Sequence, residues 1–192
     1  VLIVTNASKS NNSKFTPEYL KKIRNECKKA NEYLKVNNLF FLEHPATNLS
    51  GSNIAIISED INKFYKKTKP LYVFIPHYND IHEDHKVISK ASLVALRPNV
   101  KSNLKSIFMY ETLSETEWGE DVKNSFNPNF YFSLSKDDIQ KKINAFKFYK
   151  TQIKKYPHPR SKEGIINLAK FRGQSICQNY AESFELVRSI NK

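Results

Sequence analysis

Two aspartates and two histidines fall within six residues near the middle of the chain: Asp80, His82, Asp84 and His85. Imidazole is a favoured ligand of zinc and similar divalent ions, and a second imidazole nearby can polarise a carbonyl group or protonate a leaving group. A carboxylate can orient that second imidazole. The pattern therefore predicts metal-assisted acid–base chemistry. The alternative is that these are surface loop residues before a helix, with Asp84 as an ordinary helix cap.

The segments on either side predict how these side chains are held. An apolar run from Leu71 to Ile75 ends at Pro76 and is typical of a buried strand. After the polar loop, apolar residues recur at helical spacing, at Val87, Ile88, Ala91, Val94 and Ala95. In an open α/β sheet, ligands bind outside the carboxyl ends of the strands, which is where this loop would lie.

Strands and helices alternate along the rest of the chain. Apolar runs predict strands at residues 1–6, 39–43, 106–110 and 129–134. Helices are predicted from Thr16-Pro17 to about Val36, along Ile54–Phe64, from Ser135 to Ile153, and from residue 162 to about 190 with a break near Gly173. The alternation predicts an α/β fold with a Rossmann-like, mostly parallel sheet and helices on both faces. Without internal repeats or linkers, residues 1–192 are expected to form a single domain.

The charge of the chain bears on its partners. The 192 residues carry a formal net charge of +12, but only five of the 31 basic residues are arginine, and the lysines are spread through the helices. Abundant Lys, Asn and Ile with few Gly is the bias of an AT-rich genome. Because no motif interleaves basic with aromatic residues in the manner of RNA-binding sheets, we expect no nucleic-acid partner.

Cysteine usage and hydropathy bear on the compartment. Cys27 and Cys177 lie far apart and belong to no pairing motif, which indicates a reducing environment. No apolar run approaches the roughly 20 residues that are needed to span a bilayer. We therefore expect a cytoplasmic protein without a membrane span.

The loop and several later segments together resemble one known family. The central stretch reads Pro76-His77-Tyr78-Asn79-Asp80-Ile81-His82-Glu83-Asp84-His85. Further similar segments are Tyr110-Glu111, Ser114-Glu115-Thr116-Glu117-Trp118, Phe126-Asn127-Pro128-Asn129, Tyr149-Lys150-Thr151-Gln152, Pro157-His158-Pro159-Arg160-Ser161, Arg172-Gly173 and Ala181-Glu182-x-Phe184. Their order and spacing resemble the PIG-L/LmbE-like zinc-dependent N-deacetylases, which remove acetyl groups from N-acetylglucosamine-type sugars. The resemblance extends over essentially the whole chain and implies an LmbE-like fold.

The resemblance implies a role for each residue of the loop. His85 matches the histidine that completes a site for Zn²⁺ or another divalent metal. His82 matches a second histidine that stabilises the oxyanion or protonates the leaving amine, and Asp84 matches the aspartate that orients His82. Asp80 matches an acidic residue at the rim of the pocket.

The resemblance also implies a class of substrate. Arg24, Glu111 and Arg160 match positions that could contact sugar or phosphate groups, although each could equally be a structural ion-pair partner. We expect an N-acetylated amino sugar, linked to a lipid or a nucleotide or free as a small molecule, in surface-polysaccharide or glycoconjugate metabolism. A homo-oligomer is compatible with the sequence.

One segment of the family pattern has no counterpart in the chain. The family's first signature, His-Pro-Asp-Asp-Glu, supplies two metal ligands and the catalytic base, and it precedes the strand that residues 1–6 resemble. Neither His44-Pro45 nor His158-Pro159 is followed by acidic residues. We expect that some tens of residues precede Val1, because a chain that begins inside a core strand would leave an unpaired sheet edge. The alternative is a catalytically inactive carbohydrate-binding or scaffold protein on the same fold.

Overall fold

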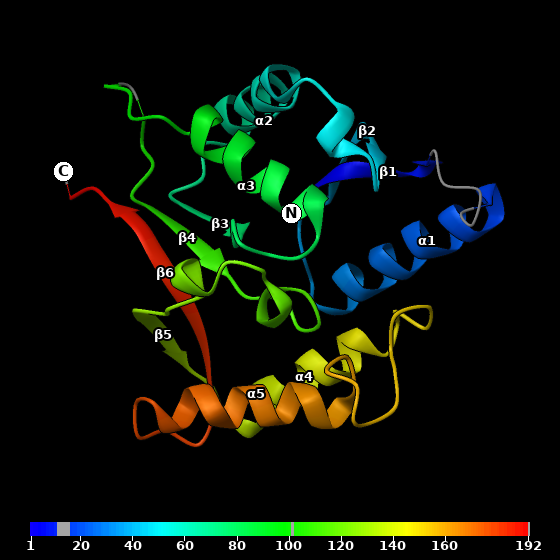
Figure 1. Cartoon of the computed structure of the whole chain (residues 1–192), viewed down its shortest axis with the longest axis vertical. Helices are drawn as coiled ribbons and strands as arrows, with labels where there is room; N and C mark the ends of the chain where they lie inside the picture. The colour runs from blue at the N-terminus through cyan, green and yellow to red at the C-terminus, as the bar shows by residue number, and fades with distance from the viewer. Residues whose placement is uncertain (11–15, 101, 192) are drawn as a thin grey trace. The chain divides into compact units, whose positions relative to one another are not determined.

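The contacts of the chain group into two units, each of which combines two separate stretches of sequence. The computed structural model describes residues 1–10, 16–100 and 102–191, with backbone alone for residues 6–10 (Figure 1). The first unit contains Val1–Thr47 and Tyr131–Glu182, and the second contains Asn48–Phe130 and Ser183–Lys192. In the described ranges, no helix is long and apolar enough to cross a membrane.

A parallel strand pair opens the first unit. Strand β1 (Leu2–Ser10) pairs with β2 (Phe40–Ala46), and helix α1 (Pro17–Tyr33) connects the two. The predicted start of α1 is confirmed: the Thr16 side chain accepts a hydrogen bond from the backbone N–H of Tyr19, and Pro17 occupies the first helical turn. The buried face of α1 consists of Leu20, Glu26, Cys27 and Ala30.

Two further helices complete the first unit. Helix α4 (Lys136–Phe146) packs against α1, and α5 (Lys162–Gln174) packs against α4. A capping box between Ser135 and Asp138 begins α4 where the sequence predicts it. The predicted extension of this helix to Ile153 is wrong, because hydrogen-bonded turns replace the helix after Phe146.

The second unit is built around the strand, loop and helix that the sequence predicts in the middle of the chain. Its elements are the short helix η1 (Leu49–Gly51), α2 (Ile54–Thr68), β3 (Tyr72–Pro76), α3 (Glu83–Ala95), β4 (Ser106–Tyr110), η2 (Thr116–Trp118) and η3 (Val122–Asn124). Strands β3 and β4 are parallel and in register, and α3 packs against β3 and α2. The buried core residues include Leu49, Ile57, Ile75, Ala91 and Ile107.

The predicted helix from residue 162 to the break near Gly173 is confirmed as α5, but its predicted continuation to about residue 190 is wrong, because this segment contains a strand. Strand β6 (Ala181–Ser189) runs antiparallel to β4, and the sheet order is β3-β4-β6-β5, with β5 at Phe130–Ser133. Ala181 and Ser183 are buried and their neighbours are not, which is the alternation of a strand. The α/β fold class is confirmed, with parallel pairing in β1–β2 and β3–β4 and an antiparallel strand beside β4.

Candidate functional site

The loop between β3 and α3 is held at the carboxyl end of β3. Strand β3 ends at Pro76, and the backbone N–H of His77 donates to the carbonyl of Tyr110, 3.1 Å away, at the end of β4. At the other end of the loop, His82 is the N-cap of α3. The loop thus lies where an open α/β sheet binds ligands, as the sequence predicts.

Asp80 is the centre of the hydrogen bonding in this loop. It is fully buried, its Oδ1 accepts from the backbone N–H of His82 (3.1 Å), and its Oδ2 accepts from the Thr116 hydroxyl (3.1 Å). Nδ1 of His85 lies 3.1 Å from the same Oδ2. Burial alone would raise the pKa of Asp80, but the neighbouring His85 imidazole and the hydrogen bonds from His82 and Thr116 outweigh this effect, and the pKa is lowered. The carboxylate is therefore ionised and enclosed, where we expected it at the rim of a pocket.

The carboxylate of Asp80 sets the tautomer of His85. Since an ionised carboxylate only accepts hydrogen bonds, the proton of the neutral imidazole belongs on Nδ1, facing Asp80. The lone pair then lies on Nε2. The His85 side chain is 25% exposed, so this arrangement is not sealed from solvent. A carboxylate behind an imidazole in this way orients the ring and makes Nε2 a stronger base and ligand.

His82 has the opposite arrangement of protons. Its Nδ1 accepts the backbone N–H of Asp84 at 3.2 Å, so Nδ1 holds the lone pair and Nε2 carries the proton. The rings of His82 and His85 stack, with centroids 4.7 Å apart and planes 18° apart. The two stacked imidazoles therefore offer a donor and a lone pair side by side. The tautomer of His82 is assigned from its hydrogen bond with Asp84, and that of His85 from the closeness of Nδ1 to the Asp80 carboxylate.

Asp84 contributes to this site in two ways. Its backbone N–H holds the His82 ring, and its buried carboxylate accepts the backbone N–H of Leu49 at 3.0 Å, which ties the start of η1 to α3. The resemblance implies that Asp84 orients His82. The contact that the structure shows between them is made by the backbone of Asp84.

Three more titratable groups lie near the end of β4: Glu111, His77 and Glu185. Glu111 follows β4 and accepts a hydrogen bond from the Ser183 hydroxyl at 3.0 Å. His77 is fully buried, and its Nε2 lies 3.3 Å from a carboxylate oxygen of Glu185. Burial lowers the pKa of His77, against the opposing effects of Glu185, Asp80 and Glu111. His77 and Glu185 were not among the predicted site residues, although the position of His77 directly after a strand was a usable signal.

The segment after β4 forms a second support for the loop, which sequence reasoning missed. Thr116 reaches Asp80, and the side-chain amide of Asn79 donates to the carbonyl of Asp121 at 2.7 Å. A Cβ on Gly119 would lie 2.1 Å from the carbonyl oxygen of Asn79, so only glycine permits this approach. These contacts join residues about forty positions apart in the sequence, so no local sequence pattern predicts them.

Arg24 and Arg160 both belong to the first unit. The Arg24 guanidinium lies 4.1 Å from the centre of the Phe41 ring. Nη1 of Arg160 donates to the side chain of Gln152 at 2.7 Å. Each arginine thus has a structural partner, and their expected contacts with a substrate remain predictions.

The described side chains do not by themselves complete a zinc site. Catalytic zinc sites typically use three protein ligands. In residues 1–5, 16–100 and 102–191, no three or more His, Cys, Asp or Glu side chains gather in a way that could hold a metal ion. Nε2 of His85 is a suitable ligand atom, and the described residues do not add two more beside it.

Comparisons with solved structures support the fold. N,N'-diacetylchitobiose deacetylase from Pyrococcus horikoshii is 17% identical, with a TM-score of 0.73 over 97% of this chain and 71% of that one. The conserved protein TT1542 from Thermus thermophilus is 22% identical, with a TM-score of 0.74 over 100% and 82% of the two chains. The zinc-inhibited form of teicoplanin deacetylase Orf2 is 14% identical, with a TM-score of 0.74 over 100% and 89%.

The family of the chain is assigned from a comparison of its sequence with models of protein families. The comparison with curated proteins gives no match. The model of the family described as "PIG-L: GlcNAc-PI de-N-acetylase" matches residues 1–96, which is half of the chain and includes the loop with Asp80, His82, Asp84 and His85. The solved structures with the same fold include deacetylases. The chain therefore belongs to the PIG-L family of de-N-acetylases.

Proposed function

We propose that this protein is a hydrolase that removes the N-acetyl group from an amino sugar of the N-acetylglucosamine type. The observation that carries the proposal is the pair of stacked imidazoles, in which His82 offers a proton and His85 a lone pair at the carboxyl end of β3. Membership of a de-N-acetylase family supports this reading. The amino sugar is free or linked to a lipid or a nucleotide.

The proposed reaction is the hydrolysis of an amide. Water adds to the acetyl carbonyl carbon, the carbonyl oxygen becomes an oxyanion, and the C–N bond then breaks to give acetate and a free amine. The Nε2–H of the neutral His82 ring suits one of these events, because it can donate a hydrogen bond to the oxyanion. Protonation of the departing amine would need the imidazolium form of His82, whose Nδ1–H would face the backbone N–H of Asp84. Because Nδ1 of His82 is held by the backbone of Asp84, the ring is oriented before the substrate arrives.

Zn²⁺ or another divalent metal is part of the proposal, with Nε2 of His85 as one ligand. A bound metal would polarise the acetyl carbonyl and lower the pKa of a bound water. What supports a ligand role for His85 is its Nδ1–Asp80 contact, since metal-binding histidines usually present their other nitrogen to a carboxylate or a carbonyl. The other ligands are not assigned.

Acetate release tests the proposal. The protein would be incubated with N-acetylglucosamine and with the same sugar linked to a nucleotide and to a lipid, with and without added Zn²⁺. We expect acetate from at least one of these substrates, and its loss in His82→Asn. Asp137→Asn, a change at an exposed residue in the first turn of α4, is the control and should keep full activity. Binding of the sugars without any acetate release would favour the alternative of a carbohydrate-binding protein.

A further inference from the structure

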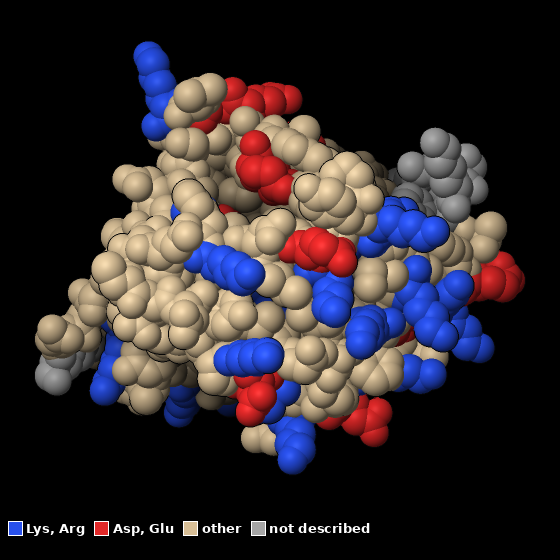
Figure 2. Space-filling view, turned by 90° about the horizontal axis from the view of Figure 1, so that it is seen from below, with Lys and Arg blue, Asp and Glu red and all other residues tan. Residues whose placement is uncertain are grey.

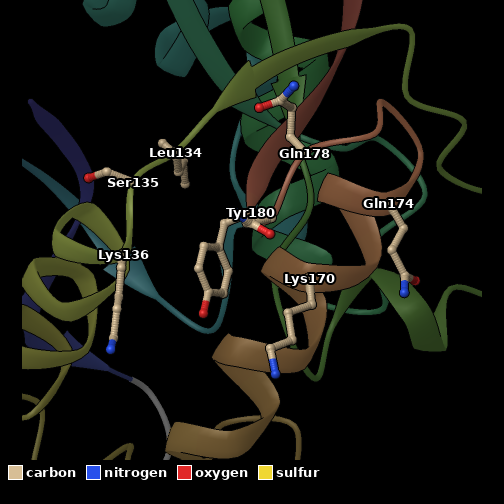
Figure 3. Close-up of a pocket in the computed structure, with 8 residues that line it drawn as sticks. Leu134, Ser135, Lys136, Lys170, Gln174, Gln178 and Tyr180 are labelled. Atoms are coloured by element: carbon tan, nitrogen blue, oxygen red, sulfur yellow. The ribbon is translucent and has the colours of Figure 1, made fainter.

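The first unit contains a pocket that has no part in the deacetylase proposal. Its volume is about 480 Å³, within the usual range of small-molecule sites, and it is formed where α4 begins and α5 ends. Its lining residues are Leu134, Ser135, Lys136, Lys170, Gln174, Gln178, Asn179 and Tyr180 (Figure 3). The Tyr180 ring lies between the two lysine side chains, with its hydroxyl on the same side as their ammonium groups (Figure 3).

The wall of this pocket is fixed by backbone contacts. A Cβ on Gly173 would lie 2.5 Å from the carbonyl oxygen of Gln178 and 2.8 Å from the backbone nitrogen of Tyr180, so the turn after α5 packs directly on the helix. On the opposite side, the backbone N–H of Leu134 donates to the carbonyl of Tyr180 at 2.9 Å. The Ser133 hydroxyl donates to the side-chain oxygen of Gln178 at 3.3 Å. Tyr180 and Gln178 are therefore held in place between α5 and the segment that leads into α4.

The charge of the lining is positive. It contains two lysines and no carboxylate. Across the described part of the chain, neither Lys136 nor Lys170 lies in an ion pair, whereas the nearby Asp138 is bound by Ser135 and Glu182 pairs with Lys142. Basic side chains are also prominent on the face that carries α4 and α5 (Figure 2). Two ammonium groups without a carboxylate partner favour an anionic ligand.

The remaining residues that line the pocket indicate which kind of anionic ligand would fit. Gln174, Gln178 and Asn179 offer amide donors and acceptors, which suit hydroxyl groups, and Tyr180 offers an aromatic face that suits a sugar ring. We propose that this pocket binds a sugar phosphate, with Lys136 and Lys170 on the phosphate and the amides and Tyr180 on the sugar. The phosphate contacts are charge-assisted hydrogen bonds, of the kind that lysine makes as a point charge.

Binding measurements that need no enzymatic activity test this inference. Glucose 1-phosphate, inorganic phosphate and glucose would be titrated into the ¹⁵N-labelled protein, with chemical shifts of the backbone and side-chain amides as the readout. The test variant is K136Q/K170Q, and the matched control is K28Q/K29Q, which removes the same charge from exposed positions on α1. Thermal unfolding of each variant verifies that it folds. Vesicles of phosphatidylcholine with and without phosphatidylglycerol test a phospholipid headgroup as another source of phosphate.

We expect glucose 1-phosphate to bind more tightly than either inorganic phosphate or glucose, and to shift the side-chain amides of Gln178 and Asn179. Its affinity should fall at least about tenfold in K136Q/K170Q and less than about twofold in K28Q/K29Q, since each charge-assisted hydrogen bond is worth at least a factor of that order. The inference is overturned by equal losses in the two double variants, by no binding at millimolar glucose 1-phosphate, or by lysine-dependent binding to the vesicles alone. Since acetate is not measured, failure here leaves the deacetylase proposal unaffected.

Discussion

Replacement of Asp80 by Asn tests whether this carboxylate organises the loop. Asn keeps an oxygen that can accept the backbone N–H of His82, but it puts an amide N–H₂ where Oδ2 now meets Thr116 and His85. The new N–H₂ would face the Nδ1–H of His85, donor against donor. His85 must then move or shift its proton to Nε2, which removes the lone pair that the site presents.

The magnitude follows from the loss of the negative charge that Thr116 and His85 contact, since the Thr116 hydroxyl can still accept a hydrogen bond from the new amide. A hydrogen bond to a charged group contributes about 1.5–3 kcal/mol, and Asp80 is fully buried. Allowing for partial relaxation, we expect Asp80→Asn to lower the free energy of unfolding by about 2–4 kcal/mol at pH 7. The pKa of Asp80 is lower in the folded protein than in the unfolded chain, where it is about 3.9. The stability from the ionised form is therefore fully present above about pH 4 and is lost as the pH falls through the folded pKa.

Urea unfolding at pH 7 and at pH values below 4 measures both effects. The difference in unfolding free energy between wild type and Asp80→Asn should be largest at pH 7 and should shrink in acid. Asp137→Asn, at an exposed position, should stay within about 0.5 kcal/mol of wild type throughout. A change as small as this in Asp80→Asn at pH 7, or a difference that grows as the pH falls, would refute the reasoning.

Three further predictions concern the same loop. His85→Ala should lower the affinity of the protein for a divalent metal while His82→Ala leaves that affinity unchanged, which metal titration of the two purified variants checks; equal losses in both would contradict their separate roles. His82→Asn should lower turnover by a factor of about 10²–10³, as loss of an oxyanion donor does elsewhere, which an activity assay measures. The free energy of unfolding of His82→Asn should exceed that of His82→Ala by about 1 kcal/mol, because Asn is a good N-cap, and urea unfolding of the two variants measures this difference. Gly119→Ala should lower the unfolding free energy by about 1–3 kcal/mol, since its Cβ would meet the carbonyl of Asn79. An unchanged unfolding midpoint would contradict this prediction, because it would mean that the loop can move away from the new Cβ at no cost.

Much of the fold could be predicted because its signals are local. Thr16-Pro17 and Ser135 both begin helices through caps that involve neighbouring residues. Strand β6 was mistaken for helix because Ala181, Glu182 and other good helix formers occupy a segment whose pairing partner, β4, lies some 75 residues earlier. The choice between the two states is made by burial against β4, which no local pattern encodes.

The candidate site shows the same division. The residue types at 80, 82, 84 and 85 are visible in the sequence, but the N-cap of α3 is His82 and not Asp84, which was the cap in the alternative interpretation of the loop. The conformation of the loop decides the remaining contacts. It places Asp80 beside His85 and lets the Asp84 carboxylate accept the backbone N–H of Leu49. It also brings the Thr116 hydroxyl within hydrogen-bond distance of Asp80. Several carboxylates lie within a few residues of one another in this loop. Their spacing in the sequence does not show which carboxylate contacts which donor.

The positions of the imidazole protons test the central claim most directly. Long-range ¹H–¹⁵N spectra of the histidine side chains, assigned with His82→Asn and His85→Asn, would be recorded at a pH where the rings are neutral. The structure predicts that His82 is protonated at Nε2 and His85 at Nδ1. If both rings carry their proton on the same nitrogen, the paired donor and lone pair do not exist, and the proposed catalytic arrangement is contradicted.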